Sequence, residues 1–470
     1  MSDVTRRNFV KTGALATAFF VSGTKNAKVL GANDRINVCV TGIHGRGGSH
    51  IDEFQSMDGV EVVCLVDPDA RTFEGRSKQV VKLGGREPKT YQDIRQALDD
   101  DSIDVISCAT TNHWHALTTV WACQAGKDVY VEKPCSHNIY EGRQSVNAAR
   151  KYNRIVQHGT QSRSDRNWWR IKKLVEDGKY GKLLVSRGLV YKRRKSIGYE
   201  PFAKPPQEVA YDIWLGPAPE QPFCTNLVHY NWHWFWDFGN GDIGNQGVHQ
   251  MDIARWMLPG DRKLPESVLC LGGRFGYDDQ GETPNTQVAV MDYGDGQYLV
   301  FEVRGLETDD YHGTKTGNTL HFEEGLIANN RFYPRGRGDG ERLPDVEVEM
   351  GPTGPGGHFG NFIAAVRSRD IKDLNADIEE GHYSSALCHL ANISYRVGMK
   401  VPATDEKPFG DAEVGNEAYR RMMEHLDEEV YQMGRILYID PKEENIVNDV
   451  EAQTMISRNY REPFVVPEIS

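Results

Sequence analysis

A glycine-rich turn between a short apolar strand and a helix limits the fold of this chain more than any other feature. The strand is predicted at residues 35–41, and Gly42-Ile43-His44-Gly45-Arg46-Gly47 follows it directly. Twenty residues past Gly47, the apolar strand 60–66 ends in Asp67. This order is typical of a dinucleotide-binding unit, in which the acidic residue accepts hydrogen bonds from the adenosine ribose.

The turn departs from the G-x-G-x-x-G pattern at one position. His44 stands where a middle glycine would let the backbone approach the pyrophosphate. Gly45, the next residue, restores part of that access, so we expect a displaced phosphate position and a retained site. Asp67 would repel a 2′-phosphate, which favours NAD as the cofactor. NADP is the alternative cofactor, because Arg71 could reach such a phosphate.

The first part of the chain is predicted to be a Rossmann domain. With 470 residues the chain is too long for one ordinary core, so two domains are expected. Strands alternate with helices in residues 33–158, which predicts a parallel sheet. The strands are expected at 36–41, 60–66, 103–109, 129–131 and 155–156, and helices at 113–125 and 139–152.

Residues 159–450 are predicted to form a substrate-binding α/β domain. Longer strands with fewer helices between them indicate a large open sheet that is mostly antiparallel. These strands are expected at 183–191, 267–275, 287–293, 297–304 and 319–323. Late helices at 359–368 and 379–398 are expected to pack back on the Rossmann domain, and residues 451–470 to form a C-terminal tail.

Residues 1–32 are predicted to be an export signal and linker. Thr5-Arg6-Arg7-Asn8-Phe9-Val10-Lys11 looks like a twin-arginine signal, and the apolar stretch 13–21 is too short for a stable membrane span. We therefore expect the twin-arginine export machinery as a partner and a periplasmic or exported protein, tethered to the membrane if the signal stays uncleaved. That route carries folded proteins, so the cofactor is expected to travel bound.

Composition excludes some classes of function. The net charge of −12 argues against a general nucleic-acid binder, since phosphate neutralisation needs clustered Lys and Arg. Cys39, Cys64 and Cys108 fall on predicted buried strands and no Cys-x-x-Cys occurs, so the cysteines are interpreted as apolar fillers. A small-molecule enzyme is favoured.

A lysine stands where the chemistry is expected. Val131-Glu132-Lys133-Pro134 ends a strand of the predicted parallel sheet, and such sheets bind ligands at the carboxyl ends of their strands. Oxidation of a carbinol requires a base beside the hydroxyl while a hydride leaves the same carbon. Burial of Lys133 beside a positive nicotinamide would lower its pKa into a useful range.

These motifs resemble the Gfo/Idh/MocA family, which takes its name from glucose-fructose oxidoreductase, inositol dehydrogenase and a rhizopine-catabolism protein. The resemblance covers roughly residues 33–396. It is carried by Gly42 to Gly47, Thr111-Asn112-His113-Trp114-His115-Ala116, Glu132-Lys133-Pro134 and Gly241-Asp242-Ile243-Gly244-Asn245-Gln246-Gly247-Val248-His249-Gln250-Met251-Asp252. It implies a Rossmann domain followed by an open-sheeted α/β domain, with a carbohydrate substrate held between them.

The resemblance also assigns candidate residues. Those for the cofactor are Gly42, His44, Gly45, Arg46, Gly47, Asp67, Thr110, Asn112, His113, His115, Glu132 and Lys133. His113 and His115 open the helix after a cofactor-side strand, so we expect them at the nicotinamide end, and we expect no metal site.

His249 is the second catalytic candidate, as a proton relay or an alternative base. The resembling proteins commonly have an aspartate four residues earlier on the same helical face, where this chain has Asn245. An amide can orient the imidazole ring but supplies no charge, so His249 should be less basic than in an Asp–His pair. Asp252 could compensate in part or cap local structure.

An aromatic segment is expected near the substrate. His229-Tyr230-Asn231-Trp232-His233-Trp234-Phe235-Trp236-Asp237 offers flat apolar faces for sugar C–H groups and polar groups for hydroxyls. The substrate-binding candidates are Tyr230, His233, Asp237, Asn245 and His249.

Three functions remain open from the sequence. The first is an oxidoreductase that acts on a sugar, polyol or glycoside. The second is a redox-neutral glycoside hydrolase, in which bound NAD transiently oxidises a sugar hydroxyl, the glycosidic bond is eliminated and the hydride returns. The third is a non-catalytic sugar-binding protein on the same scaffold. A homo-oligomer is expected for any of them.

Overall fold

The glycine-rich turn belongs to a six-stranded parallel sheet, as predicted. The computed structural model describes residues 35–260, 263–336, 338–403, 407–424, 426 and 430–470. The sheet order is β3-β2-β1-β4-β5-β6, and every neighbouring pair is parallel. Its strands are β1 (Ile36–Thr41), β2 (Val60–Val66), β3 (Lys89–Tyr91), β4 (Val105–Cys108), β5 (Asp128–Val131) and β6 (Val156–His158). The order reverses between β1 and β4, which is where such sheets bind ligands.

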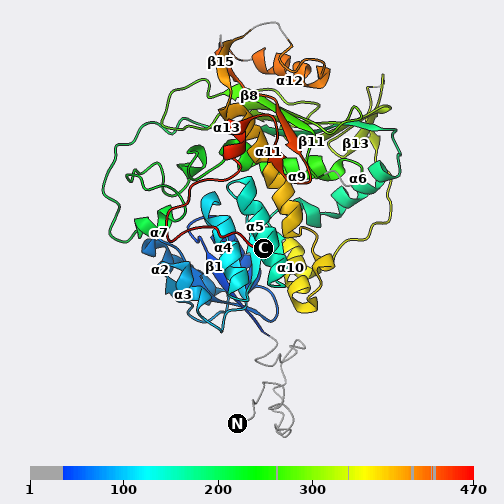
Figure 1. The fold of residues 1–470 in the computed structure, drawn as a ribbon. Coiled ribbons are helices and arrows are strands. Elements are labelled where there is room, and N and C mark those ends of the chain that lie inside the picture. The colour runs from blue at the N-terminus through cyan, green and yellow to red at the C-terminus, as the bar shows by residue number, and fades with distance from the viewer. Residues whose placement is uncertain (1–34, 261–262, 337, 404–406, 425, 427–429) are drawn as a thin grey trace. The chain divides into compact units, whose positions relative to one another are not determined.

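Helices cover both faces of this sheet (Figure 1). They are α1 (Arg46–Gln55), α2 (Phe73–Lys82), α3 (Ile94–Leu98), α4 (Asn112–Gln124) and α5 (Ile139–Lys151). Strand and helix residues form two apolar cores, one on each face. Strand β3 was not predicted, because it has only three residues and two of them are exposed.

The second domain contains a mixed twelve-stranded sheet within the described residues, which confirms the expected architecture. The main path is β14-β13-β12-β11-β7-β10-β9-β8-β16-β15. Only β7 and β10 pair in parallel among the strand pairs described for this sheet. Its strands are β7 (Leu183–Tyr191), β8 (Ser267–Gly273), β9 (Thr286–Asp292), β10 (Tyr298–Arg304), β11 (Thr316–Phe322), β12 (Gly325–Ala328), β13 (Arg331–Pro334), β14 (Glu341–Arg342), β15 (Met399–Pro402), β16 (Val430–Met433), β17 (Leu437–Asp440) and β18 (Asn445–Ile446).

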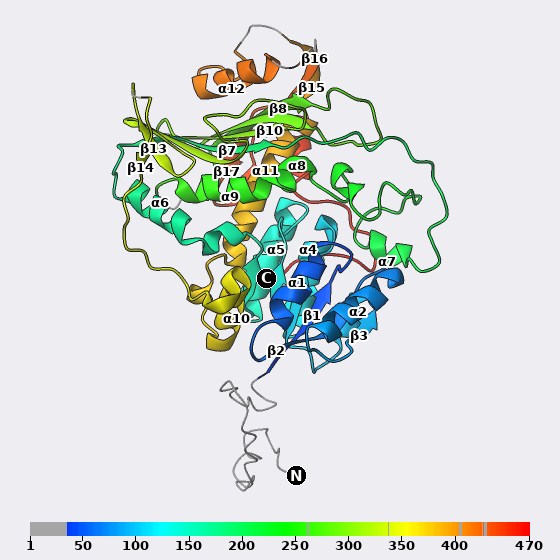
Figure 2. The ribbon, with the colours of Figure 1, turned by 180° about the vertical axis from the view of Figure 1, so that it is seen from behind.

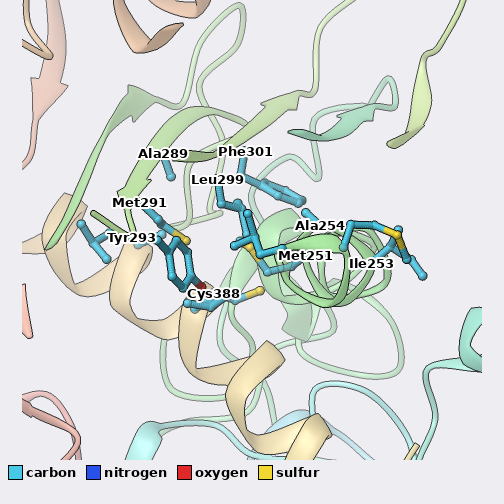
Figure 3. Close-up of a cluster of buried hydrophobic side chains, with 14 of the residues drawn as sticks. Met251, Ile253, Ala254, Ala289, Met291, Tyr293, Leu299, Phe301 and Cys388 are labelled. Atoms are coloured by element: carbon cyan, nitrogen blue, oxygen red, sulfur yellow. The ribbon is translucent and has the colours of Figure 1, made fainter. Parts of the chain in front are cut away.

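The largest apolar core lies between this sheet and two long helices. Helices α9 (Gly247–Met257) and α11 (Ile378–Arg396) cover the face that looks toward the Rossmann domain, and α12 (Glu413–Met423) lies on the other face (Figure 2). Figure 3 shows Met251 from α9, Phe301 from β10 and Cys388 from α11 within this core. The core fixes α9, and with it His249, relative to the sheet.

The remaining helices connect or cover these layers. They are α6 (Arg166–Glu176), α7 (Tyr211–Leu215), α8 (Gly241–Gly244), α10 (Gly357–Ser368) and α13 (Val450–Thr454). Helix α10 packs on the Rossmann domain, where Phe359 stacks on Tyr130 with ring centroids 4.5 Å apart. Helix α11 also contacts that domain, since Ser385 Oγ accepts a hydrogen bond from the Cys135 N–H at 3.2 Å.

The last residues, which we expected to form a tail, are packed into the Rossmann domain. Phe464, Val466 and Ile469 are buried in the core that contains Trp114. Arg461 donates a hydrogen bond from Nη2 to the Asp212 carbonyl at 2.7 Å. The segment therefore joins the two domains.

All eight cysteines are buried and unbridged, which agrees with their interpretation as apolar fillers. The predicted twin-arginine signal and linker, residues 1–32, lie outside the described residues. In the part of the chain that is described, no helix combines the length and apolar character needed to cross a membrane.

Candidate active site

A cavity of about 680 Å³ lies at the carboxyl ends of the Rossmann strands. The Rossmann domain forms one wall. The opposite wall comes from α9 and from residues 192–240, which link β7 to α8 and are called the arm below. Cavity residues foreseen from the sequence are Gly42, His44, Gly45, Arg46, Asp67, Thr110, Asn112, His115, Glu132, Lys133, Tyr230, His233, Asn245 and His249.

The glycine-rich turn is shaped for close backbone approach. Gly42 has φ +78°, and a Cβ there would lie 2.5 Å from the Ala109 carbonyl oxygen. At Gly47, which does not line the cavity, a Cβ would lie 2.3 Å from the Gly42 carbonyl oxygen, so this glycine lets α1 start against the turn. Nothing lies within 4 Å of a Cβ built at Gly45, which faces the cavity. The turn therefore fits a dinucleotide, because it combines an open backbone with a helix N-terminus.

Asp67 holds the turn in addition to lining the cavity. Its Oδ2 accepts a hydrogen bond from the Ile43 N–H at 2.8 Å, and its Oδ1 accepts one from the Asp69 N–H at 2.9 Å. Burial raises the pKa of Asp67 to about 6. The sequence predicted a ribose acceptor here, and the structure adds a structural role for the same carboxylate.

The unusual His44 side chain contacts the arm. Its ring stacks on that of His229, with centroids 3.8 Å apart and planes 3° apart. His229 Nε2 lies 2.8 Å from Asp69 Oδ2, and Arg71 Nη2 donates to the same oxygen at 2.6 Å. Arg71, which we expected to be able to reach a 2′-phosphate of NADP, is thus paired with the Asp69 carboxylate.

Lys133 reaches into the cavity from the end of β5. Its Nζ donates hydrogen bonds to the main-chain carbonyl of Asn245 at 2.8 Å and to Asn245 Oδ1 at 3.1 Å. Burial lowers the pKa of Lys133, and the nearby Glu132 carboxylate opposes that shift. The side chain is therefore fixed in place by acceptors that carry no charge.

Glu132 anchors the strand end next to Lys133. Its Oε1 accepts a hydrogen bond from Arg46 Nε at 2.8 Å and lies 3.1 Å from His50 Nε2. Burial opposes its ionisation, but the hydrogen bond with His50 and the charges of Arg46 and Lys133 hold the pKa of Glu132 well below its usual range. The carboxylate ties α1 to β5 on the cavity floor.

The expected pairing of Asn245 with His249 is wrong. Asn245 lies in the turn between α8 and α9, so the two residues are not on one helical face, and its amide oxygen accepts from Lys133. The ring of His249 has no hydrogen bond to another described residue. Burial, followed by the charge of Lys133, lowers the pKa of His249 to about 4. Asp252 is ion-paired with Arg163, with Nε 2.9 Å from Oδ2.

Two further candidates lie outside the cavity. Asp237, expected near the substrate, is about half exposed and accepts a hydrogen bond from Gln221 Nε2 at 3.1 Å. His113, expected at the nicotinamide, points into the core, where its Nε2 donates to the Trp214 carbonyl at 3.1 Å. Both residues are close in sequence to cavity residues, but neighbouring positions on helix α4, and in the irregular segment that contains Asp237, face different directions.

Sequence reasoning also missed residues that line the cavity. These include Gln92, Thr118, Gln161, Ile213, Trp214 and Trp232. Trp232 stacks on His233 with centroids 3.6 Å apart. The aromatic density around Trp232 was visible in the sequence, whereas Gln92 and Gln161 carried no signal. Among the described residues, no group of three or more His, Cys, Asp or Glu is arranged to hold a metal.

The fold and the cavity define a two-domain, dinucleotide-binding protein with a lysine at the carboxyl end of strand β5 of its Rossmann sheet. The chain belongs to the Gfo/Idh/MocA oxidoreductase family. Residues 36–160 match its domain described as "Oxidoreductase family, NAD-binding Rossmann fold", and residues 167–428 match its "Oxidoreductase family, C-terminal alpha/beta domain". NAD is accordingly the cofactor, as predicted.

Solved structures share this fold at low sequence identity. The WlbA dehydrogenase from Bordetella pertussis, in complex with NADH and UDP-GlcNAcA, is 20% identical with a TM-score of 0.58, covering 79% of this chain and 99% of that one. A levoglucosan dehydrogenase in complex with NADH and L-sorbose is 18% identical with a TM-score of 0.54, covering 76% of this chain and 96% of that one. These likenesses establish the fold.

Sequence relatives carry a different name. A "Glycosyl hydrolase family 109 protein" from Shewanella baltica (strain OS155 / ATCC BAA-1091) is 25% identical over 207 residues, which are 39% of this chain and 45% of that protein. One of the same name from Shewanella pealeana is 25% identical over 201 residues, or 38% and 44% of the two chains. The matched region thus spans less than half the length of these relatives.

Proposed function

We propose that the protein is an NAD-dependent oxidoreductase that acts on a sugar, polyol or glycoside. The observation that carries the proposal is the position of Lys133, whose partly buried side chain lines the cavity that the glycine-rich turn and α9 enclose. His249 and the aromatic arm residues Tyr230 and Trp232 line the same space. Aromatic faces next to a few polar groups suit a carbohydrate.

Lys133 is proposed as the general base. Oxidation of a secondary alcohol moves a hydride from carbon and a proton from the hydroxyl, and the nicotinamide supplies the hydride acceptor. The proton passes to the neutral amine of Lys133. Its lowered pKa increases the neutral fraction near physiological pH, and the Asn245 oxygens hold Nζ in place.

His249 is proposed to support this transfer. With a pKa of about 4 its ring is neutral at pH 7 and offers one acceptor and one donor to a substrate hydroxyl. The ring lines the cavity without a fixed hydrogen-bond partner among the described residues. It is thus available to a ligand.

The second candidate function is a redox-neutral glycoside hydrolase. The relatives named glycosyl hydrolase family 109 favour it. In this reaction the hydride taken from a sugar hydroxyl carbon returns after elimination of the glycosidic bond, so no external electron acceptor is consumed. The binding-protein alternative is disfavoured because Lys133 and His249 both face the cavity.

The location of the protein is also a proposal. Export by the twin-arginine machinery is supported by Arg6, Arg7, Phe9 and Lys11 in the first residues. A homo-oligomer is proposed on the ground that the second domain carries a large open sheet.

The test combines nucleotide analysis with turnover. Protein purified from its natural compartment is denatured to identify the released nucleotide, and native protein is incubated with a panel of sugars and glycosides. Ketone or lactone formation with stoichiometric NADH supports the oxidoreductase. Glycosidic cleavage without accumulated NADH supports the hydrolase. Bound NAD without either product would favour the binding protein.

Removal of the base gives a sharper test of the site. Lys133→Met should reduce kcat by about 10²- to 10⁴-fold while bound NAD is retained. Lys195→Met, at an exposed arm lysine, is the matched control and should behave like the wild type. Wild-type turnover in Lys133→Met would remove Lys133 from the mechanism.

A further inference from the structure

The arm closes the outer side of the cofactor cavity. Six of its residues line the cavity, namely Ile213, Trp214, His229, Tyr230, Trp232 and His233. The glycine-rich turn and the end of β2 form the facing wall. A nucleotide held along the carboxyl ends of the Rossmann strands is therefore covered by a segment of the other domain.

The arm is fastened to the Rossmann domain at the end of β2. The Ala70 N–H donates to the Glu208 carbonyl at 3.0 Å, and the Ala210 N–H donates to the Pro68 carbonyl at 2.8 Å. Gln92 Nε2 donates to the Glu208 carbonyl at 2.8 Å. These contacts form a small antiparallel bridge beside the cavity.

A second attachment lies on α4. Trp114 Nε1 donates to the Ile213 carbonyl at 3.1 Å. Gly216 approaches the Trp114 ring so closely that a Cβ there would lie 2.3 Å from it. Since α7 packs here on α4, the arm is attached to the Rossmann domain at two places before residue 217.

The contact between His44 and His229 is the third contact between the arm and the Rossmann domain. His229 lies 2.8 Å from Asp69 Oδ2, and its ring stacks on His44 in the glycine-rich turn. His44 is the residue that replaces the middle glycine of the dinucleotide motif. A glycine at this position would leave His229 without its stacking partner.

We propose that His44, His229 and Asp69 form a clasp that retains NAD in the cavity between turnovers. The clasp joins the turn expected to hold the pyrophosphate to the arm that covers it. The nucleotide then behaves as a resident group, and its exchange requires the stack and the Asp69 contact to break. This inference rests on the proposed use of NAD by the enzyme, and it explains why the motif carries a histidine.

The test is the rate at which bound nucleotide leaves, which needs no substrate. Protein loaded with NAD labelled in the nicotinamide ring is mixed with excess unlabelled NAD, and retained label is followed by rapid gel filtration. His229→Ala and His44→Gly should each release label at least tenfold faster than the wild type. His229→Phe, which keeps the stack but loses the Asp69 contact, should be intermediate.

Controls separate this inference from the proposed function. His312→Ala, at a histidine outside the cavity whose ring contacts Tyr311 beneath Arg421 of α12, should release label at the wild-type rate. Equal rates in wild type, His229→Ala and His44→Gly would overturn the clasp, as would wild-type release within seconds. His44→Gly serves if His229→Ala does not fold. Slow release without any turnover would contradict the enzymatic proposal and leave the clasp standing.

Discussion

The contact between Lys133 and Asn245 determines how the proposed base meets its substrate. Lys133 Nζ donates to both oxygens of Asn245, at 2.8 Å and 3.1 Å. Neither oxygen carries a formal charge, so this contact positions the amine without the strong stabilisation of the ammonium form that a carboxylate would add. The Asn245 side chain thus accepts a hydrogen bond from Lys133, and it does not orient the ring of His249.

Replacement of this amide by a carboxylate makes a testable prediction. Asn245→Asp should raise the pKa of Lys133 by about 1–2 units, because an opposite charge would lie beside Nζ. The rising limb of kcat/KM against pH should move to higher pH by the same amount. Profiles measured with a substrate from the panel check this.

Asn245→Ala is the matched control for that profile. It removes the side-chain acceptor but keeps the main-chain carbonyl, so the limb should move much less than in Asn245→Asp. A limb that stays in place in Asn245→Asp would mean that Lys133 is not the group that titrates in the profile.

At the level of elements, the C-terminal segment is part of the Rossmann core. Phe464 is 1% exposed and packs on Trp114, with ring centroids 5.5 Å apart. Trp114 in turn supports the arm through Ile213 and Gly216. The last residues therefore stabilise the wall of the cavity although they do not line it.

Loss of this packing should be measurable. Phe464→Ala should lower the free energy of unfolding by roughly 3–5 kcal/mol, the usual cost of removing a buried aromatic ring. Val450→Ala, at a side chain that is 84% exposed, should change it little. Urea unfolding of both variants tests this, and similar midpoints would show that the segment contributes no core packing.

Most elements could be predicted from the sequence, because apolar runs of strand length recur in both domains. The predicted strand 183–191 matches β7 at both ends, and 60–66 matches β2. The arm offered no such periodicity. Its attachment pairs Val209 with Asp69, and no local pattern specifies a contact between residues so far apart in the chain.

At the level of the whole molecule, buried neutral histidines make stability depend on pH. Burial lowers the pKa of His113, His158 and His389 to about 3 and that of His358 to about 4. In the unfolded chain these rings titrate at about pH 6.5. Below that pH the unfolded state takes up protons that the folded state does not, so stability falls as pH falls.

Two buried carboxyl groups act in the opposite direction. Burial raises the pKa of Asp67 to about 6 and that of Glu141 to about 7, so the folded state binds these protons first as pH falls. The histidines outnumber these two carboxyl groups, since burial also lowers the pKa of His233 and His321 to about 3 and that of His249 to about 4. The free energy of unfolding should therefore drop by roughly 4 kcal/mol or more between pH 7.5 and pH 5. Urea midpoints at both values measure this change, and equal stability would contradict it.

The sequence by itself determined the family, the two kinds of sheet, the NAD-binding turn and the lysine at the strand end. These features depend on short runs of residues whose spacing is read along the chain. Tertiary structure alone decided that Asn245 contacts Lys133 instead of His249, that Asp237 and His113 lie outside the cavity, and that His44 stacks on His229. Such contacts join residues up to 185 positions apart, and only the packing of one domain against the other brings them together.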